Sequence, residues 1–369
     1  MRILHFYKTA YPDSIGGVEQ VIHQLASGMT KQNITIDVLA LTTNKCTSSL
    51  HVENYIVHRS YQIAQIASTG VSLSVFSKFV ALAKQADIVH YHFPWPFMDL
   101  VHFITQMHKP SVVTYHADIV RQKKLLKFYQ PLMSRFLSSV DMIVATSPNY
   151  LTTSPVLQNF VEKTTVIPLG LDQQLYPSPT ITKLNYWRQR IGPKFFLFVG
   201  VLRYYKGLHI LLAALKNLNY PIVIVGDGSL KLQLQEQAVK LGLGNIHFLG
   251  YVDNIDKIAL ITLCYSVIFP SHLRAEAFGM SLLEGAMFGK PLLSCEIGTG
   301  TSFINIHDLT GLVVPPQDSE ALAQAMQFLW SHEEIATFMG EQAKLRYQQL
   351  FTADKMLASY ADLYRQLLV

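Results

Sequence analysis

The chain has 369 residues, of which 50% are hydrophobic and 15% are charged. This length and composition allow two domains with large buried cores and argue against disorder. The formal net charge of +5 is modest, and the basic residues form no dense stripe, so a nucleic-acid-binding surface is not predicted.

The three cysteines, Cys46, Cys264 and Cys295, are scattered and show no paired spacing. Their spacing predicts neither a disulfide framework nor a zinc cluster and favours the reducing cytoplasm as the location. The apolar run at the N-terminus is too short for a signal peptide or an anchor. No segment reaches about 18 uncharged apolar residues, so no membrane-spanning helix is expected.

Short apolar runs alternate with helical patterns along the whole chain, which is typical of parallel sheets covered by helices on both faces. The first set of predicted strands comprises residues 3–7, 34–41, 88–91, 111–115, 142–145 and 165–167. Residues 172–194 are rich in proline and polar residues, which indicates an interdomain linker with a short helix. The second set comprises residues 195–199, 222–225, 246–249, 267–269, 292–294 and 311–314. The pattern predicts two doubly wound α/β domains whose strand C-terminal ends face a shared cleft.

The segment of residues 267–285 carries the strongest functional pattern. A buried strand ends at Phe269, a polar loop with Glu276 follows, and a predicted helix begins near Gly279. Glu284 lies about one turn inside that helix, on the face directed back toward the loop. The free backbone N–H groups of a helix start can bind phosphate. The segment therefore predicts half of a sugar-nucleotide site.

Two cations follow the first strand of the second domain. That strand ends at Gly200, and Arg203 and Lys206 precede the next predicted helix. This order suits the binding of a diphosphate. An unrelated pair of surface cations is the less favoured interpretation, because the strand end is directed at the cleft. After the following strand, residues 226–228 are interpreted as a turn.

Candidate residues also follow strands of the first domain. Gly16 and Gly17 allow a close backbone approach to a ligand, with an ordinary tight turn as the alternative. The full spacing of a nicotinamide-binding fingerprint is absent. His116 and Asp118 follow the strand of residues 111–115 and are predicted at the cleft mouth. The alternative is a helix N-cap at Asp118 with a bystander histidine.

His90 and His92 are expected on the same side of one strand. They could form half of a metal site. Without a nearby cysteine or carboxylate cluster, packing and hydrogen bonding are favoured. No Asp-x-Asp motif that would hold a divalent ion is found between the strands, so no metal is expected.

A basic and apolar segment follows residue 120. It contains Arg121, Lys123, Lys124 and Lys127 beside Leu125, Leu126 and Phe128, at helical spacing. Such a helix can dock on anionic lipid, where each cation near the surface contributes about 1 kcal/mol. A merely solvated helix face is the default alternative.

Together and in order, these motifs resemble the retaining GT-B glycosyltransferases of family 4 (glycosyl transferases group 1) over nearly the whole chain. The most specific match is Glu276-Ala-Phe-Gly279 with Glu284 after seven intervening residues. Supporting matches are Gly16-Gly17, Tyr115-His116, residues 167–172, Lys206-Gly207, and residues 269–271 and 311–315. The motifs around Lys206 and His116 look most like bacterial mannosyltransferases of O-antigen or exopolysaccharide assembly.

The resemblance implies roles for individual residues. The implied catalytic residues are Glu276, His116, Lys206 and Arg203, and the implied donor-binding residues are Gly17, Glu284, Phe278, Gly279, Met280 and Ser281. Glu284 would bind the ribose, Glu276 would lie beside the transferred sugar, and Lys206 with an arginine would neutralise the diphosphate. His116 would meet the donor sugar from the opposite domain. Asp118 and the cations of residues 121–127 would lie on the acceptor and membrane side.

The resemblance also implies an activity and an architecture. Residues 1–172 would bind the acceptor, residues 173–352 would bind the nucleotide sugar, and residues 353–369 would form a helix crossing back to the first domain. The expected reaction transfers mannose from GDP-mannose, without a metal and with retention of configuration, to a saccharide or lipid-linked acceptor. The expected location is the cytoplasm, with peripheral contact at the inner membrane.

Three alternatives remain open: a UDP-sugar donor, a GT-B sugar-nucleotide epimerase, and a non-catalytic sugar-nucleotide-binding protein. Two departures from the family pattern bear on the site. Val201 occupies the position where arginine is common, with Arg203 as a possible substitute, and Leu169 replaces an asparagine in the linker turn.

Overall fold

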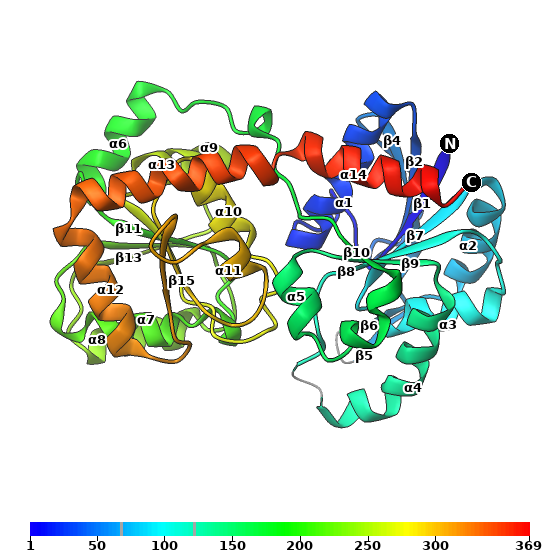
Figure 1. Cartoon of the computed structure of the whole chain (residues 1–369), viewed down its shortest axis with the longest axis horizontal. Coiled ribbons are helices and arrows are strands. Elements are labelled where there is room, and N and C mark those ends of the chain that lie inside the picture. The colour runs from blue at the N-terminus through cyan, green and yellow to red at the C-terminus, as the bar shows by residue number, and fades with distance from the viewer. Residues whose placement is uncertain (67–68, 121–122) are drawn as a thin grey trace. The chain divides into compact units, whose positions relative to one another are not determined.

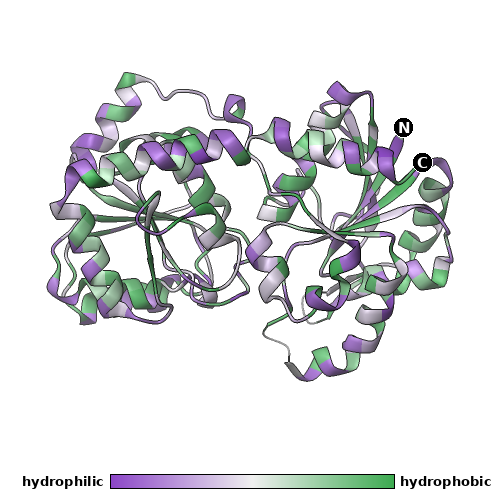
Figure 2. Cartoon of the chain, in the orientation of Figure 1, coloured by the Kyte–Doolittle hydropathy of each residue, from purple (hydrophilic) through white to green (hydrophobic). Residues whose placement is uncertain are grey.

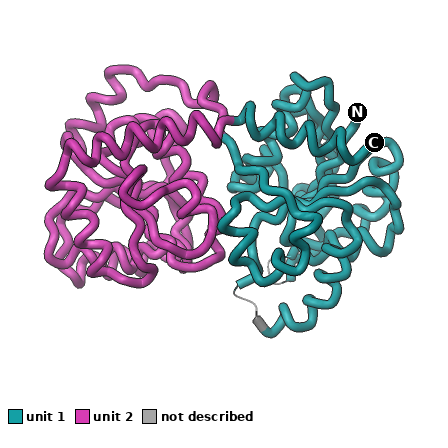
Figure 3. The backbone as a smooth tube through the Cα atoms, in the orientation of Figure 1, with its two compact units in different colours: residues 1–170, 353–369 teal, residues 171–352 magenta. Residues whose placement is uncertain are grey.

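The computed structural model describes residues 1–66, 69–120 and 123–369. The chain divides into two compact units (Figure 3). Unit 1 comprises residues 1–170 and 353–369, and unit 2 comprises residues 171–352. The division falls after Gly170, close to the boundary after residue 172 that the proline-rich segment suggests.

Unit 1 is built on a mixed eight-stranded sheet. Its strands are β1 (Arg2–Phe6), β2 (Thr35–Thr42), β3 (Leu50–Val52), β4 (Tyr55–Tyr61), β7 (Ile88–Phe93), β8 (Ser111–Tyr115), β9 (Met142–Ala145) and β10 (Thr164–Val166). Their order is β10-β9-β8-β7-β1-β2-β4-β3, and β3 is antiparallel to β4 whereas the other pairs are parallel. β5 (Ala64–Ile66) and β6 (Thr69–Val71) pair separately. The strand order changes direction between β1 and β7.

Helices cover this sheet and include the last helix of the chain (Figure 1). They are α1 (Gly17–Met29), α2 (Ser74–Gln85), α3 (Pro96–Thr105), α4 (Lys123–Ser139), α5 (Pro148–Thr153) and α14 (Ala353–Gln366), with 3₁₀ helices at Thr30–Gln32 and Leu157–Lys163. α14 buries Tyr360 and Tyr364, whose hydroxyl groups lie 2.8 Å from Thr114 Oγ1 and 2.6 Å from His90 Nδ1. The C-terminal helix is therefore part of the core of unit 1.

Unit 2 is built on a six-stranded parallel sheet. Its strands are β11 (Phe196–Val199), β12 (Ile222–Val225), β13 (Ile246–Gly250), β14 (Ser266–Phe269), β15 (Leu292–Cys295) and β16 (Gly311–Val314). Their order is β13-β12-β11-β14-β15-β16. Most strand residues are buried because helices cover both faces of the sheet. Figure 2 shows the hydrophobic strands at the centre of the unit and mixed hydropathy along its helices.

The helices of unit 2 vary widely in length. They are α6 (Ile181–Ile191), α7 (Leu208–Ala214), α8 (Lys231–Lys240), α9 (Asn254–Leu263), α10 (Met280–Met287), α11 (Gly300–Ile304), α12 (Ser319–Ser331) and α13 (Glu333–Leu350). The 3₁₀ helices are Gln173–Leu175, Tyr204–Lys206 and Leu215–Asn217. Within the described ranges, every helix is too short or too polar to cross a membrane.

The structure contains each strand that the apolar runs predict, with ends shifted by at most a few residues. It adds β3, β4, β5 and β6, which the apolar runs do not reveal, and β4 is the longest of them. β4 alternates between buried and partly exposed residues and carries His58 and Arg59 in its middle. A strand of this kind lacks the continuous apolar run that marks a strand buried on both faces.

Candidate active site

The candidate site of unit 2 begins at the switch point of its sheet. β11 lies between β12 and β14, so the chain runs from β11 toward one edge and from β14 toward the other. In open α/β sheets, ligands bind beyond the carboxyl ends of the strands at this point. The loops that follow β11 and β14 hold Lys206 and Glu276.

These two loops contact each other through their backbones. Gly207 has a φ of 70°, and a Cβ atom added there would lie 1.9 Å from the carbonyl oxygen of Pro270. The backbone N–H of His272 donates to the carbonyl oxygen of Tyr205 at 3.0 Å. Glycine is therefore required next to Lys206 both by its backbone conformation and by the close approach of the second loop.

Lys206 and Glu276 form an ion pair at the junction of the loops. The Lys206 Nζ atom lies 2.5 Å from Glu276 Oε2, and the two side chains are only 11% and 12% exposed. Ser271 Oγ also donates to Glu276 Oε2, at 3.2 Å. The Lys206 ammonium lies 4.7 Å from the ring centre of Phe269. A cation and a carboxylate are thus fixed together at the switch point, whereas Arg203 is exposed before the 3₁₀ helix of residues 204–206.

Glu284 lies in α10 and makes a separate set of contacts. Its Oε1 atom accepts hydrogen bonds from Tyr176 Oη at 2.8 Å and from Lys257 Nζ at 2.6 Å. Burial and the nearby carboxylate both raise the pKa of Tyr176, so its hydroxyl group remains a donor. Sequence reasoning singled out Glu284 but missed Tyr176 and Lys257, since neither belongs to a motif that was recognised.

The start of α10 provides backbone donors. Gly279 is the N-cap residue with a φ of 102°, and no side chain caps the first turn. Phe278 is 4% exposed, and a Cβ atom at Gly300 would lie 2.5 Å from its ring. The Phe278 side chain therefore packs in the core, and Met280 and Ser281 are the first helical residues. Any ligand contact in this segment would involve its backbone rather than the Phe278 ring.

In unit 1, α1 begins at Gly17 after an N-cap at Gly16. Gly17 is exposed, whereas the nearby Glu19 is buried. Glu19 Oε1 accepts hydrogen bonds from Thr9 Oγ1 at 2.6 Å and from Ser14 Oγ at 3.2 Å. The carboxylate thus organises the loop that leads to Gly17.

His116 is the end of a row of buried histidines that sequence reasoning identified only in part. His5 Nδ1 lies 2.9 Å from His92 Nε2, and His92 Nδ1 lies 2.9 Å from His116 Nε2. Burial lowers the pKa of His5 and of His116 to about 3, and it lowers the pKa of His92 as well. All three rings are therefore neutral near pH 7.

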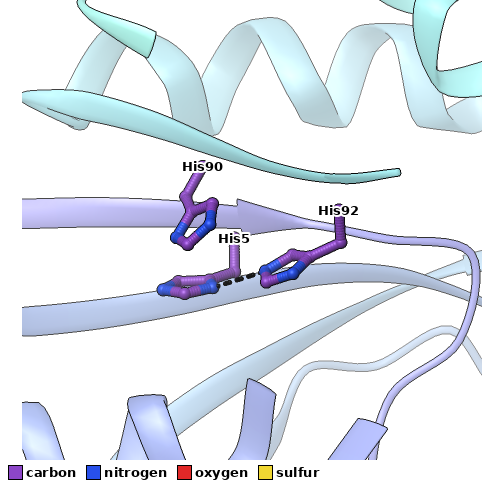
Figure 4. A group of neighbouring side chains, drawn as sticks. All are labelled: His5, His90 and His92. Atoms are coloured by element: carbon purple, nitrogen blue, oxygen red, sulfur yellow. Dashed lines mark hydrogen bonds between the residues drawn. The ribbon is translucent and has the colours of Figure 1, made fainter. Parts of the chain in front are cut away.

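Figure 4 shows His5, His90 and His92, which come from two neighbouring strands and could be considered as metal ligands. Their nearest nitrogen atoms lie within 4.8 Å of one another. However, both nitrogens of His90 have hydroxyl partners, Tyr364 at 2.6 Å and Thr114 at 2.7 Å. His92 uses both of its nitrogens in the histidine row. These hydrogen bonds agree with the packing interpretation of His90 and His92.

Asp118 is part of a hydrogen-bonded network rather than the cap of a helix. Tyr115 Oη and Ser154 Oγ donate to its Oδ1 atom at 2.9 and 2.8 Å. Residues 119 and 120, which follow Asp118, are not helical. The N-cap alternative for Asp118 is therefore wrong, because the chain does not become helical directly after it.

The predicted basic helix corresponds to the first part of α4. Arg121 lies outside the described residues, and Lys123 is the first residue of the helix. Lys124 and Lys127 are exposed, as are Leu125 at 54% and Phe128 at 86%.

Comparison with known proteins identifies the class to which this fold and site belong. Residues 15–175 match the model described as Glycosyltransferase Family 4, and residues 185–346 match Glycosyl transferases group 1. D-rhamnosyltransferase WbpZ of Pseudomonas aeruginosa is 60% identical over 353 residues, which are 96% of this chain and 93% of that protein. O-antigen chain mannosyltransferase C of Escherichia coli is 49% identical over 368 residues, covering 100% of this chain and 99% of that protein.

Solved structures show the same fold at low sequence identity. A sucrose-phosphate synthase from Thermosynechococcus elongatus has a TM-score of 0.83 at 21% identity and covers 99% of this chain and 98% of its own. WaaG, a glycosyltransferase involved in lipopolysaccharide biosynthesis, has a TM-score of 0.71 at 16% identity and covers 98% and 99%. The chain belongs to the glycosyl transferases of group 1, family 4, and it has the GT-B fold with two Rossmann-like α/β units. It is a glycosyltransferase.

Proposed function

We propose that the chain transfers mannose or rhamnose from a GDP-sugar to a saccharide or lipid-linked acceptor during O-antigen synthesis, with retention of configuration. The names of the two relatives, a D-rhamnosyltransferase and an O-antigen mannosyltransferase, support this sugar class. D-rhamnose is 6-deoxy-D-mannose, so both sugars share the axial 2-hydroxyl group. The observation that carries the assignment of the site is the Lys206–Glu276 pair at the switch point of unit 2.

The proposed chemistry follows from the charges at the ends of β11 and β14. Cleavage of the bond between the sugar and the diphosphate places negative charge on phosphate and positive charge on the anomeric carbon. Lys206, Arg203 and the backbone N–H groups at the start of α10 stabilise the negative charge. They can do so without a metal ion, and metal-independent turnover is part of the proposal.

The acceptor hydroxyl attacks the anomeric carbon from the side that the diphosphate leaves, and its proton passes to the departing phosphate oxygen. Glu276 lies beside the sugar and also holds Lys206 in place. A nucleophilic Glu276 is the alternative route to retention, by analogy with retaining hydrolases. Glu284 binds the ribose hydroxyl groups, while Tyr176 and Lys257 hold its carboxylate. His116 and the backbone of Gly17 contribute contacts to the donor sugar.

The proposal is tested with a panel of GDP-mannose, GDP-D-rhamnose, UDP-glucose and UDP-N-acetylglucosamine. Binding of a preferred donor raises the unfolding temperature by mass action, and transfer to an acceptor is measured separately. We expect a GDP-sugar to give the largest shift and to be the transferred donor. Preference for a UDP-sugar would contradict the donor assignment. Product release without acceptor would indicate an epimerase, and binding without transfer would indicate a non-catalytic protein.

We further propose that the first half of α4 binds anionic membrane on the acceptor side. Phe128 is 86% exposed and Leu125 is 54% exposed, and the cations Lys124 and Lys127 flank them. The other half of the helix is anchored, because Met133, Phe136 and Leu137 are buried. Exposed apolar side chains between cations are typical of an interfacial helix.

Co-sedimentation with phosphatidylglycerol vesicles tests this surface. We expect binding at low salt that weakens with added salt, and weaker binding after Phe128→Ser together with Lys127→Gln. A matched control is Phe338→Ser with Lys344→Gln on α13, where Phe338 is 49% exposed. Equal binding of both double variants would contradict the assignment to α4.

A further inference from the structure

The row of His5, His92 and His116 has a geometry that constrains where its protons lie. The two N···N distances are both 2.9 Å, and the ring centroids are 5.1 and 5.2 Å apart. In each pair the planes are inclined by only 21°. The centroid separation is close to the N···N distance plus two ring radii. Each hydrogen bond therefore lies nearly in line with both ring planes.

Neutral imidazole has one N–H donor and one acceptor nitrogen. Because His92 uses both nitrogens within the row, the two hydrogen bonds must run in the same direction. In the first arrangement, Nδ1–H of His5 donates to His92, Nδ1–H of His92 donates to His116, and His116 retains Nδ1–H. In the second arrangement, every proton lies on Nε2, and His116 presents a bare Nδ1 atom.

The far end of the row distinguishes the two arrangements. His5 Nε2 is completely buried and has no hydrogen-bond partner among the described residues. In the second arrangement this atom would be an unpaired buried N–H group, whereas in the first it is an unpaired acceptor. Among backbone groups, orphaned buried N–H groups are rarer than under-satisfied carbonyl acceptors, and we apply the same order to the imidazole nitrogens. The first arrangement is therefore favoured.

The other end of the row is the ring of His116, which is 7% exposed. Its Nε2 atom is occupied by His92, and no hydrogen bond is found for its Nδ1 atom within the described part of the chain. Nδ1 is therefore the nitrogen of His116 that remains for a ligand.

We propose that His5 and His92 are positioning residues that hold His116 as the Nδ1–H tautomer, so that His116 donates a hydrogen bond to an oxygen atom of the bound nucleotide sugar. The ligand contact rests on the proposed function, whereas the tautomer does not. In this role His116 is a neutral donor and not a general base. Burial lowers the pKa of the ring to about 3, which favours the neutral form near pH 7.

The direct test is nitrogen NMR of the full chain with ¹⁵N-labelled histidine, without ligand. Imidazole nitrogens with and without a proton have well-separated shifts, and His116→Gln identifies the signals of His116 by their absence. We expect Nδ1–H for His116 between pH 6 and 8. An Nε2–H tautomer for His116 in the wild-type chain would overturn the proposal, and His116→Gln serves only to assign the signals.

Variants of His92 then test the link to catalysis. His92→Leu removes the donor to His116, and we expect loss of the Nδ1–H form with a fall in kcat/KM of about tenfold, the size expected for one hydrogen bond. His92→Asn places an amide N–H near the original Nδ1 position, and we expect it to restore both properties to within about twofold. The tautomer would have no role in catalysis if both variants lost kcat/KM equally while His92→Asn kept the Nδ1–H form of His116.

Failure of the inference and failure of the proposed function give different results. If no sugar nucleotide binds or is transferred but His116 carries Nδ1–H, the tautomer assignment stands and the proposed function fails. If transfer occurs with His116 as the Nε2–H tautomer, the proposed function stands and the inference is wrong.

Discussion

The two units carry polar side chains near the switch points of their sheets in opposite electrostatic forms. Unit 1 holds His5, His92 and His116 as buried neutral rings joined by hydrogen bonds. Unit 2 holds two ion pairs, Lys206–Glu276 and Lys257–Glu284, whose distances are 2.5 and 2.6 Å. Similar strand topology therefore positions neutral donors in one unit and charges in the other.

The difference indicates which unit can respond to an anionic ligand. An ion pair can exchange part of its interaction with a carboxylate for an interaction with a phosphate, so the charge of unit 2 is available to a diphosphate. Burial lowers the pKa of the histidines in the row and so favours their neutral forms near pH 7, in which they offer directional hydrogen bonds. Under the proposed function, unit 2 therefore supplies charge stabilisation and unit 1 supplies directional contacts from neutral groups.

The largest expected effect comes from removing the cation of unit 2. Lys206→Ala should lower kcat by about 100-fold to 1,000-fold, because it removes a charge that stabilises the leaving diphosphate. The donor affinity should change much less. Steady-state kinetics with a GDP-sugar measure both quantities. Lys183→Ala is the control, since Lys183 pairs with Asp256 at 2.8 Å in the same unit; an equal loss in the control, or near wild-type turnover of Lys206→Ala, would contradict this role.

Acid should weaken unit 1 through its neutral histidines. Folding lowers the pKa of these rings from its value of about 6.5 in the unfolded chain. Below about pH 6.5 the unfolded chain therefore binds more protons than the folded chain, and the folded state becomes less stable as the pH decreases. At pH 5.5, each ring whose pKa is lowered to about 3 removes about 1.4 kcal/mol from the free energy of unfolding relative to pH 8.

Hydrogen exchange at matched intrinsic rates can locate this acid effect. β1, β7 and β8 should lose protection before the strands of unit 2 as the pH falls from 7 to 5. His5→Leu should reduce the pH dependence of the free energy of unfolding by the contribution of one histidine ring. Earlier loss of protection in β11 and β14 would reverse the comparison between the units.

The smallest expected effect concerns competition for Lys206. Glu276→Gln removes a carboxylate that both neutralises Lys206 and repels a diphosphate, so GDP should bind about threefold to tenfold more tightly while transfer falls. Calorimetric titration with GDP measures the affinity. Asp362→Asn is the control, because Asp362 forms an exposed pair with Arg365 at 2.8 Å and should not change GDP binding. Weaker GDP binding by Glu276→Gln would contradict this prediction and show that the carboxylate favours nucleotide binding.

The strands could be predicted because apolar runs are a local signal in the sequence. The candidate residues at the strand ends could be predicted because ligands of open α/β sheets bind beyond the carboxyl ends of the strands. Lys206 and Glu276 were identified separately, and their contact became visible only when the sheet order placed β11 beside β14. Tyr176 and Lys257 could not be found in this way, since their contact with Glu284 depends on how α9 and the preceding linker pack. His5 was missed because a single histidine in an apolar strand carries no pattern.

Hydrogen exchange of the full chain with and without GDP tests whether the loops after β11 and β14 hold the diphosphate of the donor. We expect protection in residues 200–207 and 270–284. The placement of the diphosphate would be contradicted by the opposite pattern at saturating GDP. In that pattern both segments stay unprotected, and the amino-terminal edge of the same sheet gains protection.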